Sequence, residues 1–164
     1  MAFLPLRSVS LPAAADASYE AWLDDLDGQL DAPGADWPAV VRQVLLGLYH
    51  PELPDWEAAV ADPRRSRAAR AALLALDPRN ITLEPEYYAD VDPVRFARVK
   101  PLLWLWYSFD RAPLAGQNVA LGVALRRRLA PRIFARCGRN FKCFQHVEFS
   151  YGYNLEVGDD VVIH

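Results

Sequence analysis

The chain has 164 residues, of which 52% are hydrophobic and 24% are charged, so it can bury a core and is not a disordered chain. Two cysteines are too few for a disulfide scaffold, and a formal net charge of −3 argues against a nucleic-acid partner. This length fits one domain, or one small domain with part of another.

The sequence contains no apolar run of about 18 residues, the length that a membrane-spanning helix needs. Its first residues, Met1 to Pro5, lack the basic run and long apolar core of a signal peptide. We therefore expect a cytoplasmic protein. The bias toward Arg over Lys, together with 25 Ala, indicates a bacterial genome rich in G and C.

The charges are unevenly distributed along the chain. Residues 1–93 hold 7 basic and 16 acidic residues, residues 94–142 hold 11 basic residues and only Asp110 as an acid, and residues 143–164 hold four acids and no base. The cationic segment 94–142 could contact CoA phosphates, an acyl carrier protein or an anionic membrane surface. A solvated helix face is the favoured interpretation, because charge runs and aromatic residues usually serve solubility and packing.

The first part of the chain is predicted to be helical. Ser18 is a candidate cap for a helix with Leu23, Leu26 and Leu30 on one face, and Asp36 is a candidate cap for the next helix. Asp62-Pro63 is a start signal for an Ala/Arg-rich helix.

Residues 77–93 indicate an ordered but irregular connection. A helix broken or kinked at Pro101 is expected after it, and another helix from about residue 114 to about residue 129. Asp110 and Arg111 are expected to form an ion pair at a helix end or to organise the helical region, without a catalytic role.

From Asn140 onward, aromatic residues, Val, Ile and Gly replace the helix formers, which predicts short strands. The boundary falls between about residues 132 and 140, which gives a helical domain over 1–131 and a strand region over 132–164. Tyr151, Val157 and Ile163 recur every six residues, and Gly152 and Gly158 follow the first two.

An aliphatic residue and a Gly at a six-residue period are typical of the corners of a parallel β-helix. A plain hairpin with its turn at residues 158–160 explains the same residues, and the rhythm alone does not separate the two interpretations.

The segment HVEFSYGYNLEVGDDVVIH, residues 146–164, resembles the entry coil of hexapeptide-repeat acyltransferases, in the maltose and galactoside O-acetyltransferase branch. Asp160 replaces the usual second Asn of that pattern, and His164 stands where relatives carry an Asn near the acceptor site. Residues 77–88 and 100–113 are similar to the N-terminal region of a longer bacterial subgroup. The residues that match the pattern are Phe149, Tyr151, Gly152, Asn154, Leu155, Val157 and Gly158.

The resemblance implies a mainly α N-terminal region followed by the first coil of a left-handed parallel β-helix. It implies transfer of an acetyl group, or another acyl group, from CoA to a saccharide-type hydroxyl, by a homotrimer in which a histidine on a later coil is the general base. That histidine is expected beyond residue 164, so the chain is expected to be an N-terminal piece that is inactive alone. His164 is the one residue tentatively placed near the acceptor site. The acyl-CoA is a substrate, no tightly bound cofactor is expected, and no CoA-binding residue is assigned.

Cys137, Cys143 and His146 lack the close pairing of metal ligands, so no metal site is predicted. The same residues lack the orienting group that Cys–His catalysis needs. The rival hypothesis is a non-catalytic helical interaction module whose strand tail pairs with the sheet edge of a partner. A degenerate relative of the acyltransferases that only binds or regulates is a third possibility.

Overall fold

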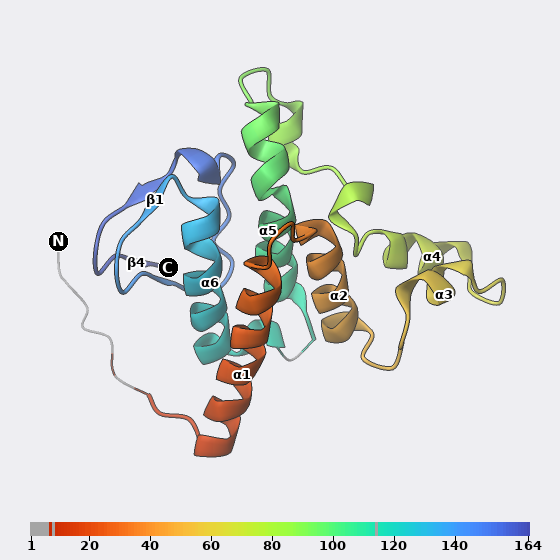
Figure 1. Cartoon of the computed structure of the whole chain (residues 1–164), viewed down its shortest axis with the longest axis horizontal. Coiled ribbons are helices and arrows are strands. Elements are labelled where there is room, and N and C mark those ends of the chain that lie inside the picture. Colours follow the sequence, from red (N-terminus) through yellow and green to blue (C-terminus); the bar gives the residue numbers. More distant parts are fainter. Residues whose placement is uncertain (1–6, 8, 114) are drawn as a thin grey trace.

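The computed structural model describes residue 7, residues 9–113 and residues 115–164, and it is mainly helical (Figure 1). None of the helices in these residues is long and apolar enough to cross a membrane. The helices are α1 (Ala13–Leu30), α2 (Trp37–Tyr49), α3 (Trp56–Ala61), α4 (Arg67–Leu74), α5 (Pro93–Arg111) and α6 (Val119–Ile133). Four 3-10 turns accompany them: η1 (Pro78–Asn80), η2 (Glu84–Tyr87), η3 (Ala115–Gln117) and η4 (Gly152–Asn154).

Of the three helix starts predicted for the first part of the chain, one is confirmed. Asp36 caps α2, as predicted, by accepting from the backbone N–H of Ala39. The prediction that Ser18 caps the first helix is wrong, because α1 begins after Pro12 and the Ser18 hydroxyl donates to a backbone carbonyl inside the helix. The alanines before Ser18 are strong helix formers, so they extend the helix by more than a turn.

Asp62-Pro63 does not start a helix, which corrects a second prediction. Asp62 ends α3, and its carboxylate accepts from the backbone N–H and the side chain of Arg64. Ser66 caps α4 instead, by accepting from the backbone N–H of Ala69. Bonding to Arg64 holds the Asp62 carboxylate in a turn, where it cannot serve as a helix cap.

A helix broken or kinked at Pro101 was expected, and the break is wrong, since α5 runs without interruption from Pro93 to Arg111. Pro101 is buried, as are the leucines that follow it. Burial of this apolar turn offsets the backbone hydrogen bond that proline removes. The helix expected from about residue 114 starts later, at Val119 after the Asn118 cap, and residue 114 lies outside the described residues.

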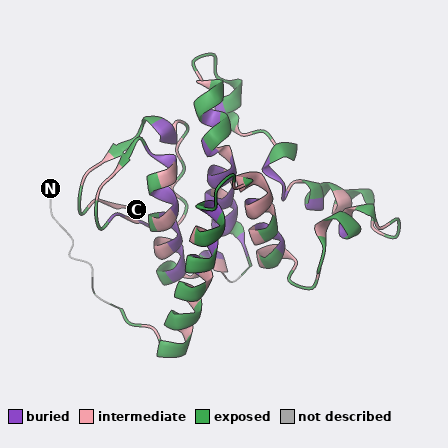
Figure 2. Ribbon diagram, in the orientation of Figure 1, coloured by how far each residue is buried: buried purple, intermediate pink, exposed green. Residues whose placement is uncertain are grey.

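α5 forms the centre of the molecule, with α2 and α6 packed against it and α1 against α6 (Figures 1 and 2). Trp106 and Phe109 of α5 are fully buried, and Trp22 of α1 stacks on Phe109 with ring centroids 6.5 Å apart. Helices α3 and α4 form an arm on the opposite side of α5 from the strands. The irregular connection predicted over residues 77–93 is present as η1 and η2.

The strands are short and pair in parallel. They are β1 (Arg136–Cys137), β2 (Lys142–Cys143), β3 (Glu156–Val157) and β4 (Val162–Ile163). β1 pairs with β3 and β2 pairs with β4, and in both pairs the partner lies 20 residues further along the chain. The hairpin interpretation required β3 to pair with β4 across residues 158–160, so these pairings exclude it.

Between β2 and β3 the chain runs through an irregular segment and η4, with no strand assigned there among the described residues. The interval between stacked positions is therefore 20 residues. The chain changes from helix to strand between Ile133 and Arg136.

Candidate functional site

Residues 136–144 and residues 156–164 lie on top of one another as two layers, which we call the first and second layer. A Cβ added to Gly138 would lie 2.3 Å from the carbonyl carbon of Gly158, so the two turns touch through their backbones. Asn140 and Asp160 both have left-handed backbone, with φ of 55° and 60°, and Asn140 Nδ2 donates to Asp160 Oδ1 at 2.8 Å. The two turns therefore repeat one conformation.

The sequence contains a pattern for this stacking, with a period of 20 residues, that the six-residue period does not describe. R-C-G-R-N at residues 136–140 corresponds to E-V-G-D-D at residues 156–160, with Gly and Asn or Asp at matching positions. The charges are complementary, since Arg139 pairs with Asp159 at 2.8 Å and Arg136 pairs with Glu156 at 3.4 Å. Of the predicted motif residues, Val157 and Gly158 lie in the second layer.

Tyr151, Gly152 and Asn154 have a different place from the one expected. They form the η4 region, which docks against the start of α5: Tyr151 donates to Asp90 at 2.6 Å, and Asn154 accepts from Arg95 at 2.9 Å. Gly152 is buried, and a Cβ there would meet the side chain of Ile133 at 2.6 Å. These residues attach the layers to the helices, and the close approach of Ile133 leaves room for no side chain at position 152.

α6 lies against the first layer and donates hydrogen bonds to it. Arg127 Nε donates to the carbonyl of Phe141 at 3.0 Å, and Arg126 donates to the carbonyl of Cys143 at 3.3 Å. Arg126 is buried and forms an ion pair with Asp110 of α5, which is also buried. Asp110 in turn accepts from the backbone N–H of His146 at 2.8 Å. Burial lowers the pKa of the Arg126 guanidinium.

Of the two expectations for Asp110 and Arg111, a mutual ion pair is wrong, whereas a contact that organises the helical region agrees with the structure. Asp110 pairs with Arg126 inside the protein, whereas Arg111 pairs with Glu148 at 2.7 Å on the surface. Successive residues on a helix point about 100° apart, so the two side chains reach different partners.

The three histidines have different surroundings. His50 ends α2 and lies 3.5 Å from Glu52, and His146 has left-handed backbone with φ of 62°. His164, the residue expected near the acceptor site, packs edge-on against Phe144 with ring centroids 6.2 Å apart. Within the described residues no catalytic pair of histidine and nucleophile is formed.

Cys137 and Cys143 are free thiols. Burial raises the pKa of both, that of Cys143 to about 11, which makes them poor nucleophiles at neutral pH. No group of three His, Cys, Asp or Glu side chains with the geometry of a metal site occurs in residues 7, 9–113 and 115–164.

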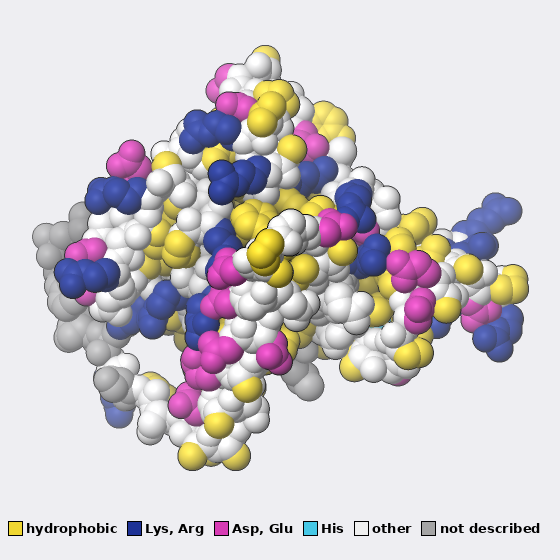
Figure 3. All heavy atoms as spheres, viewed as in Figure 1, with side chains coloured by type: hydrophobic (Ala, Val, Ile, Leu, Met, Phe, Trp, Pro, Cys, Tyr) yellow, Lys and Arg dark blue, Asp and Glu magenta, His cyan; other side chains and the backbone are white. Residues whose placement is uncertain are grey.

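Most of the cationic segment is neutralised by carboxylates. Arg128 reaches Glu20, Asp24 and Asp27 of α1. Figure 3 shows acidic side chains gathered along α1, with Lys and Arg side chains beside them. The other cations of residues 94–142 with carboxylate partners are Lys100, Arg111, Arg126, Arg132, Arg136 and Arg139. The acids of the first part of the chain and of its last 22 residues thus supply the counter-charges, which favours the interpretation of the segment as a structural surface.

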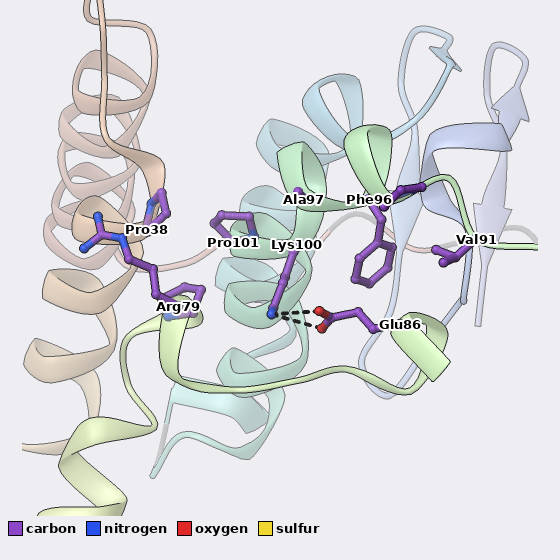
Figure 4. A pocket seen from close by; sticks show the side chains of 10 residues that line it. Pro38, Arg79, Glu86, Val91, Phe96, Ala97, Lys100 and Pro101 are labelled. Carbon is purple, nitrogen blue, oxygen red and sulfur yellow. Dashed lines mark hydrogen bonds and ion pairs between the residues drawn. The ribbon is translucent and has the colours of Figure 1, made fainter. Parts of the chain in front are cut away.

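A first hollow of about 290 Å³ lies between η1, η2 and α5 (Figure 4). Lys100 extends across it toward Glu86, with its Nζ 3.0 Å from that carboxylate and 2.6 Å from the carbonyl of Ile81. Arg79 lies on the other side and pairs with Asp36. Each charged group of this hollow therefore already has a partner, inside the lining for Lys100 and Glu86 and outside it for Arg79.

A second hollow of about 460 Å³ lies where the helices meet the segment between β2 and β3. α5 contributes Trp104, Tyr107 and Arg111 to its lining, η2 and its flanks contribute Glu84, and residues 148–150 close it. Aromatic rings, carboxylates and a guanidinium meet here in a space of the size that small ligands occupy. The residues of this site lie up to 67 positions apart in the sequence, so no local pattern marks them.

Comparisons of the chain with protein-family models, with curated proteins and with solved structures find no match.

Proposed function

We propose that this chain is the opening part of a CoA-dependent O-acyltransferase of the hexapeptide-repeat type. Its reaction is transfer of an acetyl group to a saccharide-type hydroxyl. The observation that supports the proposal most is the parallel stacking of the two layers at an interval of 20 residues, with Gly138 on Gly158 and Asn140 on Asp160. In the proposal these layers begin a left-handed β-helix.

The way α6 meets the first layer also supports this proposal. Its arginines donate to carbonyls of the first layer, so that edge is covered by a helix. Repeat proteins need such a cap at the end of the stack, because an uncovered strand edge leads to aggregation. Further coils would then add to the second layer, on the side away from α6.

In the proposed reaction a histidine takes the proton from the acceptor hydroxyl, and the oxygen attacks the thioester carbonyl carbon. The bond from carbon to sulfur breaks, and the CoA thiolate leaves with the proton. In the proposal, as the resemblance implies, the base lies on a later coil beyond residue 164, trimers form through those coils, and residues 1–164 alone are inactive.

The test is the protein encoded by the whole reading frame, including any codons after that for His164. Incubated with acetyl-CoA and a panel of sugars, it is expected to release free thiol in a sugar-dependent way, and replacement of a histidine on a later coil by Ala is expected to abolish the release. Robust transfer by residues 1–164 alone would overturn the placement of the base. Absence of transfer by the frame-length protein with every sugar would overturn the proposed activity.

One observation favours the rival function, an interaction module. Among the described residues, β3 and β4 each pair on one side only, so a second edge is available to a strand of another protein. A module of this kind is expected to be monodisperse alone and to unfold in one cooperative transition. Nonspecific association that depends on residues 156–164 would argue against it.

A further inference from the structure

The aromatic wall of the second hollow presents ring surface to its interior. Trp104 Nε1 donates to the carbonyl of Ala75 at 2.9 Å, and the Tyr107 hydroxyl donates to the carbonyl of Phe149 at 2.7 Å. Both polar atoms are thereby occupied by backbone, so these two side chains contribute apolar ring surface to the lining. Electron-rich ring faces attract the slightly positive C–H groups of a sugar ring.

The rim of the same hollow carries acceptors for hydroxyl groups. Glu148 and Arg111 form a surface pair at 2.7 Å, with 57% and 60% of their side chains exposed. Glu84 accepts the hydroxyl of Tyr88 and is exposed as well. A carboxylate has about four lone-pair positions, so each of these acids retains capacity to accept from ligand hydroxyls.

The charge of the lining selects against ionic ligands. Two carboxylates face one guanidinium, so phosphate groups such as those of CoA are repelled. Arg111, in contact with Glu148, opposes a cation. A neutral molecule with many hydroxyl groups and apolar C–H faces is the ligand that satisfies both the wall and the rim.

The aromatic and acidic surface continues past the hollow. Tyr88, held by Glu84, packs edge-on against Tyr151 with ring centroids 6.3 Å apart, and Tyr151 donates to Asp90. Tyr88 is 39% exposed. A ligand of more than one sugar unit would therefore contact aromatic rings and carboxylates outside the hollow as well as inside it.

We propose that the second hollow binds a neutral saccharide, with Glu84 and Glu148 accepting its hydroxyls and Trp104 and Tyr107 packing against its ring. This inference deepens the proposed function, on which it rests, because it locates where the acyl acceptor is held.

The test measures sugar binding to the 164-residue chain, without any transfer reaction. Maltose, lactose and cellobiose are titrated at millimolar concentration, and binding is followed by calorimetry and by saturation-transfer NMR. We expect binding of at least one of these sugars. Glu148→Ala is expected to weaken that binding about tenfold, because it removes a charged hydrogen-bond acceptor.

Glu156→Ala is the matched control. Glu156 is an exposed carboxylate of the same strand region, 64% exposed and 3.4 Å from Arg136, but it does not line the hollow. We expect this variant to bind sugar as the unchanged chain does. An equal loss in both variants, or no binding of any of the three sugars, would overturn the inference.

The outcomes also separate this inference from the proposed function. Sugar binding that requires Glu148, in a frame-length protein that transfers no acyl group, would retain the saccharide site and remove the acyltransferase proposal. Acyl transfer to a sugar that is unaffected by Glu148→Ala would retain the activity and remove this site. Displacement of the bound sugar by inorganic phosphate would show an anion site and would overturn the choice of a neutral ligand.

Discussion

Asp110 connects three parts of the molecule through one carboxylate. It lies near the end of α5, pairs with Arg126 of α6, and accepts from the backbone N–H of His146 beyond β2. That bond helps hold His146 in left-handed backbone, which is uncommon for a residue other than glycine. Arg126 in turn links Asp110 to the first layer, because it donates a hydrogen bond to the carbonyl of Cys143.

Asp110→Asn is therefore expected to destabilise the protein strongly. The change leaves the Arg126 guanidinium buried without a counter-charge, and breaking such a pair costs about 3–5 kcal/mol of unfolding free energy. Asp159→Asn is the control, because Asp159 pairs with Arg139 at the surface and about 0–1 kcal/mol is expected there. Urea unfolding of both variants measures the difference. Similar losses of unfolding free energy in the two variants would show that the buried pair of Asp110 and Arg126 contributes no more to stability than a surface pair.

The sequence identified Asp110 as the only acid among residues 94–142 but could not identify its partner. Arg111 is adjacent in the chain, whereas Arg126 becomes adjacent only when α5 and α6 pack together. A partner chosen by the packing of two helices leaves no local pattern, and for this reason the role of Asp110 could not be predicted.

At the scale of the elements, the close contact of Gly138 with Gly158 leads to a sharp prediction. Gly138→Ala would place a methyl group 2.3 Å from backbone atoms of the second layer, which cannot move aside as a flexible side chain does. We expect a loss of about 1–3 kcal/mol in the free energy of unfolding, typical of overpacking. Hydrogen exchange at the amides of β1 and β2 is expected to become faster.

Gly158→Ala is the matched control for this substitution. Among the described atoms, nothing lies within 4 Å of a Cβ built on Gly158, and its φ is outside the left-handed region. The change is expected to be nearly neutral. Equal destabilisation by the two variants would mean that the layers do not stack through Gly138.

The sequence predicts that the last part of the chain forms strands, but it does not predict which strands pair. Val157 and Gly158 do belong to parallel strands and turns, as their spacing suggested. The 20-residue correspondence with Cys137 and Gly138 was hidden because the intervening circuit contains η4 and an irregular segment. Helix starts failed where a turn bound the expected cap, as at Asp62.

At the scale of the whole molecule, the helices and the layers share one core. Phe134 after α6 and Phe149 of the irregular segment pack against Trp106 of α5, and Phe141 of the first layer packs against Phe134. The second hollow lies beside this cluster, so its walls depend on both parts of the chain. The residues of that hollow are common types without a motif, and only the meeting of α5 with residues 148–150 makes them a site.

Because the helices and the layers share one core, Cys143 is buried and Tyr107 is partly buried, and this makes the free energy of unfolding sensitive to alkaline pH. Burial raises the pKa of Tyr107 to about 12, above its ordinary value of 10.0, and burial raises the pKa of Cys143 to about 11, above 9.0. Both groups bind their protons more tightly in the folded state than in the unfolded state. Their contribution is therefore complete below pH 9 and is lost as the pH rises through 11 for Cys143 and 12 for Tyr107.

We expect the free energy of unfolding to fall as the pH rises from 9 toward 12, and this fall to be shallower in Tyr107→Phe between pH 10 and 12. Phe cannot ionise, so the variant is less stable at neutral pH for want of the hydrogen bond to Phe149 but loses less on titration. Tyr87→Phe is the control, because Tyr87 is 76% exposed, and its curve should match that of the unchanged protein. The measurement is the urea midpoint of each variant across this pH range. If the curve for Tyr107→Phe ran parallel to that for Tyr87→Phe, the neutral Tyr107 hydroxyl would not be what joins α5 to the irregular segment.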